Sequence, residues 1–219
     1  MTPPLTMLGM SGPVNTFVAG TSSGEEGGGG TAQISLRYHM YGSDMGTVYL
    51  YWESGSTYTL IWSKAGQQQT SSTNVWRLND SGTTLDGKAG ETGNFVFVYL
   101  KGGNQGFRGD AAFCEIYLSR STGSTVNLSD DSLWRTTASN SASISLTDAR
   151  SRSTSNSLPS NSLSTWCNEG GGPTPSSNTG PDKHHNDGST NDYLYFEASG
   201  STFSYNRYYT MRTASSYTL

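Results

Sequence analysis

Hydrophobic and polar side chains alternate along most of the chain with a period of two, which is the period of a β-strand. Around Trp52, for example, Val48, Leu50 and Trp52 take one set of alternating positions, and Tyr49 and Tyr51 take the other. Glycines interrupt the alternating runs at short intervals, as turns between strands require. No helical period extends far enough to compete with this pattern. The sequence therefore predicts an all-β protein.

The alternating runs predict a series of short strands joined by turns. These runs are ISLRYHMYG, TVYLYWESG, YTLIWSKAG, NVWRLN, NFVFVYLKG, DAAFCEIYLS, SLWRTT, SASISLT, DYLYFEASG and YNRYYTMRT. Uninterrupted alternation within DAAFCEIYLS would place Ala111, Phe113, Glu115 and Tyr117 on one face and Ala112, Cys114, Ile116 and Leu118 on the other.

A glycine-rich segment at residues 21–30, TSSGEEGGGG, divides the chain. We interpret residues 1–30 as an N-terminal arm with its linker, and residues 31–219 as one antiparallel β-sandwich or jelly roll. Residues 119–165, rich in Ser, Thr and Asn, form a connecting segment within the sandwich. The hydrophobic residues of the arm are expected to contact a partner: Leu5, Met7, Leu8, Met10, Val14, Phe17 and Val18.

Composition narrows the classes of function. Charged residues make up only 14% of the chain, the net charge is −4, and 13 Tyr with 5 Trp supply much of the apolar surface. The 13 Lys and Arg are scattered, whereas phosphate binding needs clustered cations, so we expect no nucleic-acid partner. No apolar run is long enough to predict a membrane-spanning helix. The first residues lack the pattern of a signal peptide, so export by the general route is not expected.

Two separated stretches resemble the two halves of one known domain, in reversed order. Residues 36–118, which contain LRYHMYGSDMGTVYLYW, LIWSKAGQQ and GFRGDAAFCEIYL, resemble the second half of a MAM domain, an extracellular adhesion β-sandwich. Residues 165–199, with GPTPSSNTGP and YLYFEAS, resemble its first half. The resemblance implies a circularly permuted MAM-like sandwich, a change that folds tolerate because domain termini often lie close together. Closure within one chain is favoured by its higher local concentration, and exchange of half-domains between subunits is the alternative.

The resemblance also implies a structural cation. Members of the family can hold one near acidic positions that correspond here to Asp110, Glu115, Asp182 and Glu197, whose oxygens suit Ca²⁺. The chain departs from the family at this point, because GDAAFCEI stands where GDIAIDDI is usual. The favoured interpretation is therefore that no cofactor is bound, that Asp110 caps a turn and that Glu197 is solvated on its strand.

Adjacent histidines suggest a second metal interpretation. His184 and His185 are flanked by Asp182, Asp187 and Asp192, and imidazole with carboxylate can bind a transition metal. Neighbouring residues on a strand point to opposite faces, so a solvated polar loop is the favoured interpretation.

Catalytic chemistry is not indicated. The H-E-x-x-H and P-loop motifs do not occur, and His39 lies within a predicted strand, where we assign it a packing role. Cys114 and Cys167 do not have the spacing of a zinc site, and we expect free buried thiols, with a disulfide between them as the alternative. The tripeptide Arg-Gly-Asp at 108–110 matches an integrin-binding motif, but the resemblance explains its Gly-Asp pair as the opening of a strand. The prediction is therefore a non-enzymatic protein.

Tyrosines near the C-terminus offer a carbohydrate-binding alternative, since exposed aromatic rings stack on sugars in many β-sandwiches. Tyr193 and Tyr195 share one face of a strand, and we expect that face to be buried in the core. Tyr205, Tyr208 and Tyr209 are the candidates for glycan contact.

These observations favour a structural protein of a bacteriophage virion, made in the host cytoplasm. It would be a decoration or cement protein of the capsid, or a component of the tail or fibre. Expected partners are major capsid or tail subunits and copies of the chain itself. The alternative is an adhesin or carbohydrate-binding module at an extracellular surface, with a host-surface glycan as its partner.

Overall fold

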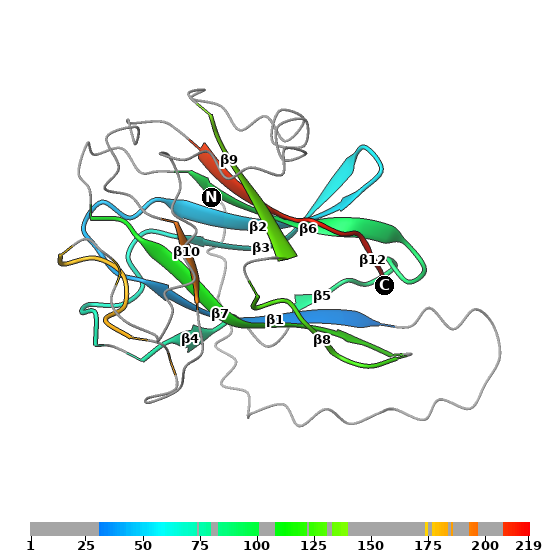
Figure 1. Cartoon of the computed structure of the whole chain (residues 1–219), viewed down its shortest axis with the longest axis horizontal. Helices are drawn as coiled ribbons and strands as arrows, with labels where there is room; N and C mark the ends of the chain where they lie inside the picture. The colour runs from blue at the N-terminus through cyan, green and yellow to red at the C-terminus, as the bar shows by residue number, and fades with distance from the viewer. Residues whose placement is uncertain are drawn as a thin grey trace, which may run out of the picture.

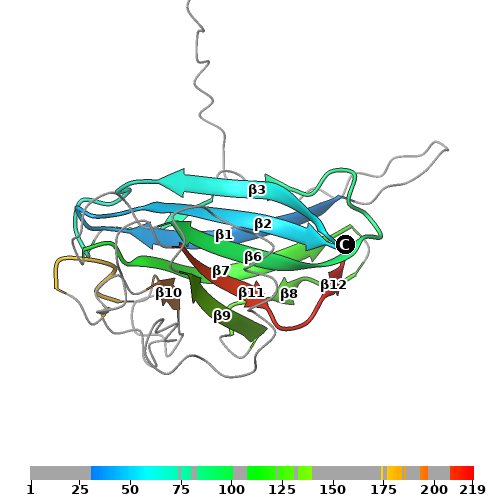
Figure 2. The same ribbon diagram turned by 90° about the horizontal axis from the view of Figure 1, so that it is seen from above.

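The chain folds into two antiparallel sheets that face each other (Figures 1 and 2). This computed structural model describes residues 31–73, 75–79, 83–100, 108–121, 123–130, 133–139, 174, 177–183, 185, 193–196 and 208–219. Every regular element among these residues is a strand, apart from a single 3₁₀ position at Leu133. The predicted all-β sandwich is confirmed at this level.

The first sheet has its strands in the order β10-β7-β1-β4. These are β10 (Leu194–Phe196), β7 (Ala111–Arg120), β1 (Ala32–Met40) and β4 (Arg77–Leu78), with β5 (Thr83–Thr84) paired to β1 and β8 (Val126–Asn127) paired to β7. The long β1–β7 pair forms the centre of this sheet.

The second sheet has the order β3-β2-β6-β11-β9. These strands are β3 (Thr57–Ala65), β2 (Thr47–Ser54), β6 (Thr92–Leu100), β11 (Tyr208–Thr213) and β9 (Trp134–Ser139), with β12 (Tyr217–Thr218) paired to β6. Figure 2 shows β3, β2, β6 and β11 side by side in this sheet. The β2–β3 hairpin turns at Gly55, whose φ of +59° suits the first loop position of a type II′ turn.

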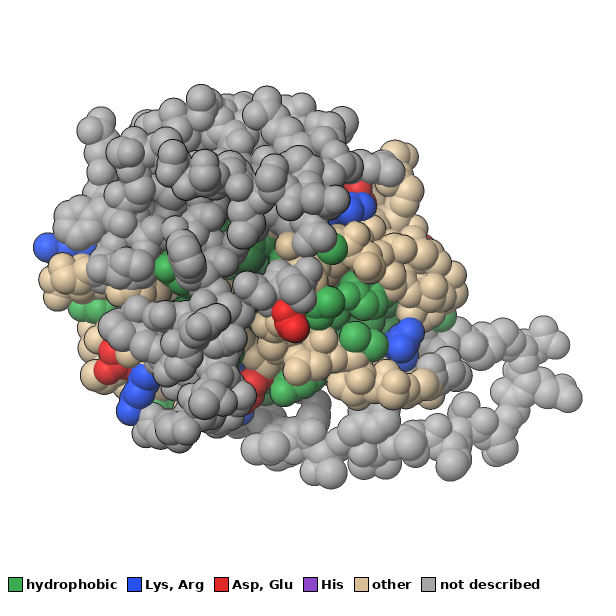
Figure 3. Space-filling view, in the orientation of Figure 1, with side chains coloured by type: hydrophobic (Ala, Val, Ile, Leu, Met, Phe, Trp, Pro, Cys, Tyr) green, Lys and Arg blue, Asp and Glu red, His purple; other side chains and the backbone are tan. Residues whose placement is uncertain are grey.

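Aromatic side chains fill the space between the sheets. Phe97 of β6 stacks on Phe113 of β7 with ring centroids 4.7 Å apart, and Tyr38 packs on Trp62 at 5.1 Å. These pairs join one sheet to the other, so rings supply the burial that the modest number of aliphatic residues does not. At the edge near the C-terminus, Figure 3 shows hydrophobic surface between β8 and β12. Tyr217 of β12 is partly buried against the core, and burial raises the pKa of its hydroxyl.

Most predicted strands are confirmed, with differences at their ends. The predicted strand at 192–200 has only Leu194–Phe196 as strand among the described residues, and the predicted strand at 141–147 lies outside them. The two-residue strands β5, β8 and β12 were not predicted, because two residues are too few to show a period.

The predicted faces of β7 are wrong beyond Cys114. Glu115 has a φ of +48°, and the register with β1 shifts there, so that Cys114 pairs with Arg37 but Tyr117 pairs with Ser35. This is a β-bulge, in which two residues of one strand oppose one residue of the other. The bulge moves Ile116 and Leu118 to the core side, beyond Phe113, and releases Glu115 from it. Alternation read from the sequence cannot show an inserted residue.

Candidate functional site

The outer side of the first sheet carries a second, smaller cluster of buried residues. Trp76, Ala112, Cys114, Tyr193 and Tyr195 form this cluster, which we call the outer cluster. The imidazole of His39, fully buried, packs on Trp76 with ring centroids 5.6 Å apart, and Trp76 packs on Tyr193 at 5.4 Å.

These positions agree only in part with the sequence predictions. Tyr193 and Tyr195 are buried as expected, but they lie outside the main core, which instead receives Leu194 and Phe196. The packing role expected for His39 is the one observed. An outward face of a sandwich sheet is usually polar, so a buried cluster there requires a covering segment.

Three charged or ionisable side chains lie together on this outer side. Arg37 Nε donates to Glu115 Oε2 at 2.7 Å, and His185 Nδ1 lies 2.9 Å from the other carboxylate oxygen, Oε1. We call this group the clasp. It connects β1, β7 and the loop segment that contains residue 185. The bulge at Glu115 gives its carboxylate the freedom to reach both partners.

A threonine and a glycine anchor the same loop segment. The Thr179 hydroxyl donates to the Tyr41 carbonyl at 3.0 Å and accepts from the Asp110 N–H at 2.8 Å. Gly180 has a φ of +63°, and a Cβ there would lie 2.4 Å from the Thr174 hydroxyl oxygen. Only glycine fits this turn without strain. The Thr-Gly pair therefore joins the C-terminal part of the chain to two points of its N-terminal part.

The chemistry available on this side is limited. Cys114 is a free and fully buried thiol, which confirms the expectation for this cysteine, and Cys167 lies outside the described residues. Burial, with the charge of Glu115 adding to it, raises the pKa of the Cys114 thiol far above its ordinary value. Since the thiolate is the reactive form, Cys114 is a poor nucleophile at neutral pH.

The predicted metal ligands are not brought together among the described residues. Glu115 belongs to the clasp, Asp110 is fully buried at the start of β7, and the Asp182 N–H donates to the Ser72 carbonyl. No group of three His, Cys, Asp or Glu side chains forms a metal-ligand set in the part of the chain that the structure describes. Glu197 lies outside that part, as does His184. The paired histidines therefore contribute one described member, His185, to the clasp.

The Arg-Gly-Asp tripeptide at 108–110 is not arranged for receptor binding. Asp110 has no exposed surface and its N–H is bonded to Thr179. The Arg108 backbone pairs with Asp44 instead, since the Asp44 N–H donates to the Arg108 carbonyl at 2.8 Å and the Asp44 carboxylate accepts from the Arg108 N–H at 3.1 Å. Gly42 permits this approach, because a Cβ there would lie 2.3 Å from the Arg108 carbonyl oxygen.

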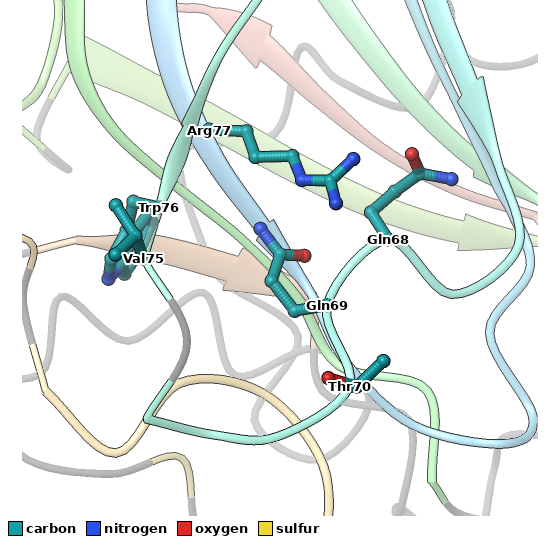
Figure 4. Close-up of a pocket in the computed structure, with 6 residues that line it drawn as sticks. All are labelled: Gln68, Gln69, Thr70, Val75, Trp76 and Arg77. Carbon is teal, nitrogen blue, oxygen red and sulfur yellow. The ribbon is translucent and has the colours of Figure 1, made fainter.

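A shallow hollow of about 360 Å³ lies beside β4. In Figure 4 the Arg77 guanidinium extends toward the side chains of Gln68 and Gln69, with Val75 and Trp76 at the other end. The Gln69 amide is engaged by the backbone, accepting from the Met40 N–H at 2.7 Å and donating to the Tyr38 carbonyl at 3.2 Å. The two hydrogen bonds of the Gln69 amide attach the loop after β3 to β1. This amide therefore has little remaining hydrogen-bonding capacity for a ligand in the hollow.

The outer side of the second sheet is different. Its β2 and β6 strands turn tyrosines and aliphatic residues outward, and these form a cluster separate from the core. We call this cluster the tyrosine face: Tyr49, Tyr51, Tyr58, Val96, Val98 and Leu100. The two valines are buried, whereas the tyrosines and Leu100 are partly exposed. Leu60, which pairs with Tyr51, is 51% exposed.

A charged group borders the tyrosine face. Glu53, almost fully buried, is 2.5 Å from Arg212 Nε, and Arg212 Nη2 donates to the Asn94 side-chain oxygen at 2.8 Å. The Tyr58 hydroxyl donates to the other Glu53 oxygen at 3.1 Å. Two opposite charges cancel here at the margin of an aromatic surface.

The glycan candidates are placed only in part. The register of β11 puts Tyr208 beside Leu100 and Tyr209 beside Tyr99, while Tyr205 lies outside the described residues. Sequence reasoning missed Tyr49 and Tyr51 as site residues, although their alternation with Val48 and Leu50 was the available signal. The seven predicted contact residues of the arm also lie outside the described part.

No known protein family, curated protein or solved structure matches this chain. Among the described residues, no helix has the length and apolarity needed to cross a membrane.

Proposed function

We propose that this chain is a non-enzymatic structural protein of a virion, a capsid decoration protein or a component of a phage tail or fibre. The arm, residues 1–30, would attach it to a neighbouring subunit, and the permuted MAM-like sandwich would project from that attachment. An adhesin role is the alternative function, which the tyrosine face favours.

One observation carries this proposal: the ionisable side chains on the outer side of the first sheet hold segments of the chain together. The clasp joins two strands to a loop, the Cys114 thiol is buried with a raised pKa, and His39 is packed against Trp76. Groups that could perform acid–base or nucleophilic chemistry instead connect segments of the chain, which suits a structural role.

The closure of the sandwich supports a single-subunit module. β10 pairs with β7 of its own chain, Leu194 opposite Phe113, and Thr179 bonds to both Tyr41 and Asp110. In this structure the C-terminal stretch completes the sandwich of its own chain, which supports the proposal that the arm, and not an exchanged half-domain, contacts a partner.

The first test is mass spectrometry of virus particles purified from the source culture, with the supernatant as the control fraction. We expect the chain in the particle at a copy number comparable with that of structural proteins. Its presence only in the particle-free supernatant would contradict the proposal and leave the adhesin alternative.

The role of the arm is tested by light scattering after size-exclusion chromatography. The full chain and a chain starting at Thr31 should both be monomers, and only the full chain should bind purified particles that lack the protein. Equal binding by both chains would remove the arm from the proposal. Oligomers of both chains would indicate exchange of half-domains.

A further inference from the structure

We propose that the tyrosine face binds a neutral oligosaccharide chain of β-linked pyranose units. This activity goes beyond attachment of the protein to a particle, because it gives the exposed sheet a ligand of its own. The proposal depends on Tyr49, Tyr51 and Tyr58 on the hairpin formed by β2 and β3.

Tyr49 and Tyr51 occupy outward positions that are unusual for aromatic side chains. The inward residues of β2, Val48, Leu50 and Trp52, are fully buried in the core, so the alternate positions Tyr49 and Tyr51 face outward. Outward positions of an antiparallel sandwich are commonly polar. Two partly exposed aromatic rings in succession therefore depart from the usual pattern of such a face.

The arrangement of the two tyrosine rings suits a ligand made of repeating units. The rings of Tyr49 and Tyr51 are nearly parallel, with an angle of 26° between their planes and centroids 6.1 Å apart. Both pack against the buried Val96 and Val98 of β6 and remain partly exposed, so each ring leaves part of its surface to solvent. Two rings in succession along a strand match a ligand that repeats a flat unit, such as a sugar chain.

These rings are supported by Tyr58, Glu53 and Arg212. Tyr58 meets Tyr51 edge-on, with planes at 87° and centroids 6.5 Å apart, and its hydroxyl is held by Glu53. Arg212 holds Glu53 in turn. A ring fixed in this way loses little conformational entropy on binding, which favours affinity.

The charges at and around the tyrosine face favour a neutral ligand. All six side chains of the tyrosine face are of uncharged types, and the charged residues Glu53 and Arg212 at its margin are ion-paired with each other. The hydroxyls of the tyrosines offer donors and acceptors beside apolar ring surface. Rings with hydroxyls suit the C–H faces and hydroxyls of a neutral sugar. Equatorial substituents leave both faces of a β-linked pyranose flat enough to lie on them.

The experiment is isothermal titration calorimetry of the full chain with cellohexaose, N-acetylchitohexaose and, as the α-linked comparison, maltohexaose. We expect at least one β-linked hexasaccharide to bind and maltohexaose to bind more weakly. Tyr49→Ala and Tyr51→Ala should each weaken binding by about fivefold or more, the effect of one lost ring contact. Tyr51→Phe, which keeps the ring, should stay within about twofold.

Two further variants serve as controls for folding and for the loss of a tyrosine elsewhere on the surface. Tyr51→Leu still covers Val96 and Val98, so it should fold normally and lose binding as Tyr51→Ala does. Tyr117→Ala, at a partly exposed tyrosine of the first sheet, is the matched control and should bind as the unchanged protein does.

Three results would overturn the proposal: no binding to any hexasaccharide, equal loss of binding in Tyr117→Ala, or preference for maltohexaose. If the tyrosine-face variants instead change only the oligomeric state seen by light scattering, the face is a protein contact. The detection of the chain in virus particles is an independent result, which tests the proposed structural role and not the binding of sugar.

Discussion

The outer sides of the two sheets both carry aromatic residues, which are buried on the first sheet and partly exposed on the second. On the first sheet, Trp76, Tyr193 and Tyr195 are buried with Cys114 in the outer cluster. On the second, Tyr49 and Tyr51 lie in a cluster of the same kind and remain partly exposed.

The difference lies in what holds the rings from outside the sheet. Trp76 donates its indole N–H to the Lys183 carbonyl at 3.1 Å, and the clasp fixes His185 beside Glu115, so a loop segment is attached over the first sheet. Among the described residues, Tyr49 and Tyr51 of the second sheet pack on Tyr58, Val96 and Val98, which belong to the same sheet. Aromatic side chains on a strand thus do not by themselves indicate core or surface, because the attachment of a loop decides the outcome.

The largest expected effect is on the second sheet. Arg212→Met would leave Glu53 buried without its cationic partner, and breaking such a pair costs about 3 kcal/mol of unfolding free energy. Urea denaturation at neutral pH measures the loss. The double variant Glu53→Gln with Arg212→Met should recover a large part of it, and a loss in the double variant equal to that of the single one would show that packing, not charge, is responsible.

An intermediate effect is expected on the first sheet. Thr179→Val keeps the side-chain shape but removes the acceptor of the buried Asp110 N–H, at a cost of about 2 kcal/mol, while the Tyr41 carbonyl keeps its hydrogen bond from the Gly180 N–H. Thr179→Ser keeps the hydroxyl and should resemble the unchanged protein.

The same variant tests whether the loop covers the outer cluster. In a Cys167→Ser background, Cys114 should react very slowly with a thiol reagent, because it is fully buried and its pKa is raised. Thr179→Val should increase the labelling rate by loosening the loop. Rapid labelling before the substitution would contradict the covered state of this sheet.

The smallest effect concerns Glu91, whose carboxylate accepts a hydrogen bond from the indole N–H of the buried core residue Trp52. Hydrogen bonds from Lys88 and, to a lesser degree, from the Trp52 indole lower the pKa of the Glu91 carboxyl. A lowered pKa in the folded state stabilises the protein at neutral pH, and the stabilisation is lost as the pH falls through that pKa. Glu91→Gln should therefore cost less than about 1 kcal/mol at pH 7 and nothing in strong acid.

Unfolding curves at both pH values, with Lys88→Met and the double variant, complete the Glu91 test. A destabilisation by Glu91→Gln that is the same at both pH values would show that the carboxylate charge is not involved.

Much of the frame could be predicted from the sequence, because strands with one face in a core leave a clear period of two. The strands β1 and β2 follow it closely, and the glycine turn at Gly55 marks the hairpin. The period failed at Glu115, since a bulge depends on how two distant strands align and leaves no mark in either of them alone.

The candidate sites were less predictable. Glu115 was considered as a cation ligand and His185 was expected in a solvated polar loop, yet the structure places both beside Arg37 in the clasp. Residues 37, 115 and 185 are far apart along the chain, and no local pattern states that they meet. Tyr49 and Tyr51 were visible as an alternating pair, but their position relative to Val96 and Val98 comes only from the β2–β6 register.

The sequence by itself determined the class of fold, the separation of inward from outward residues on most strands, and the turns that only glycine can form, because each depends on local backbone preference and a short-range period. The tertiary structure decided which outward aromatic residues become covered, where the register shifts, and which charges meet. Those outcomes depend on contacts between residues that lie 69 to 138 positions apart, as the bonds of Thr179 illustrate. Contacts at such separations form only when the two sheets close on each other.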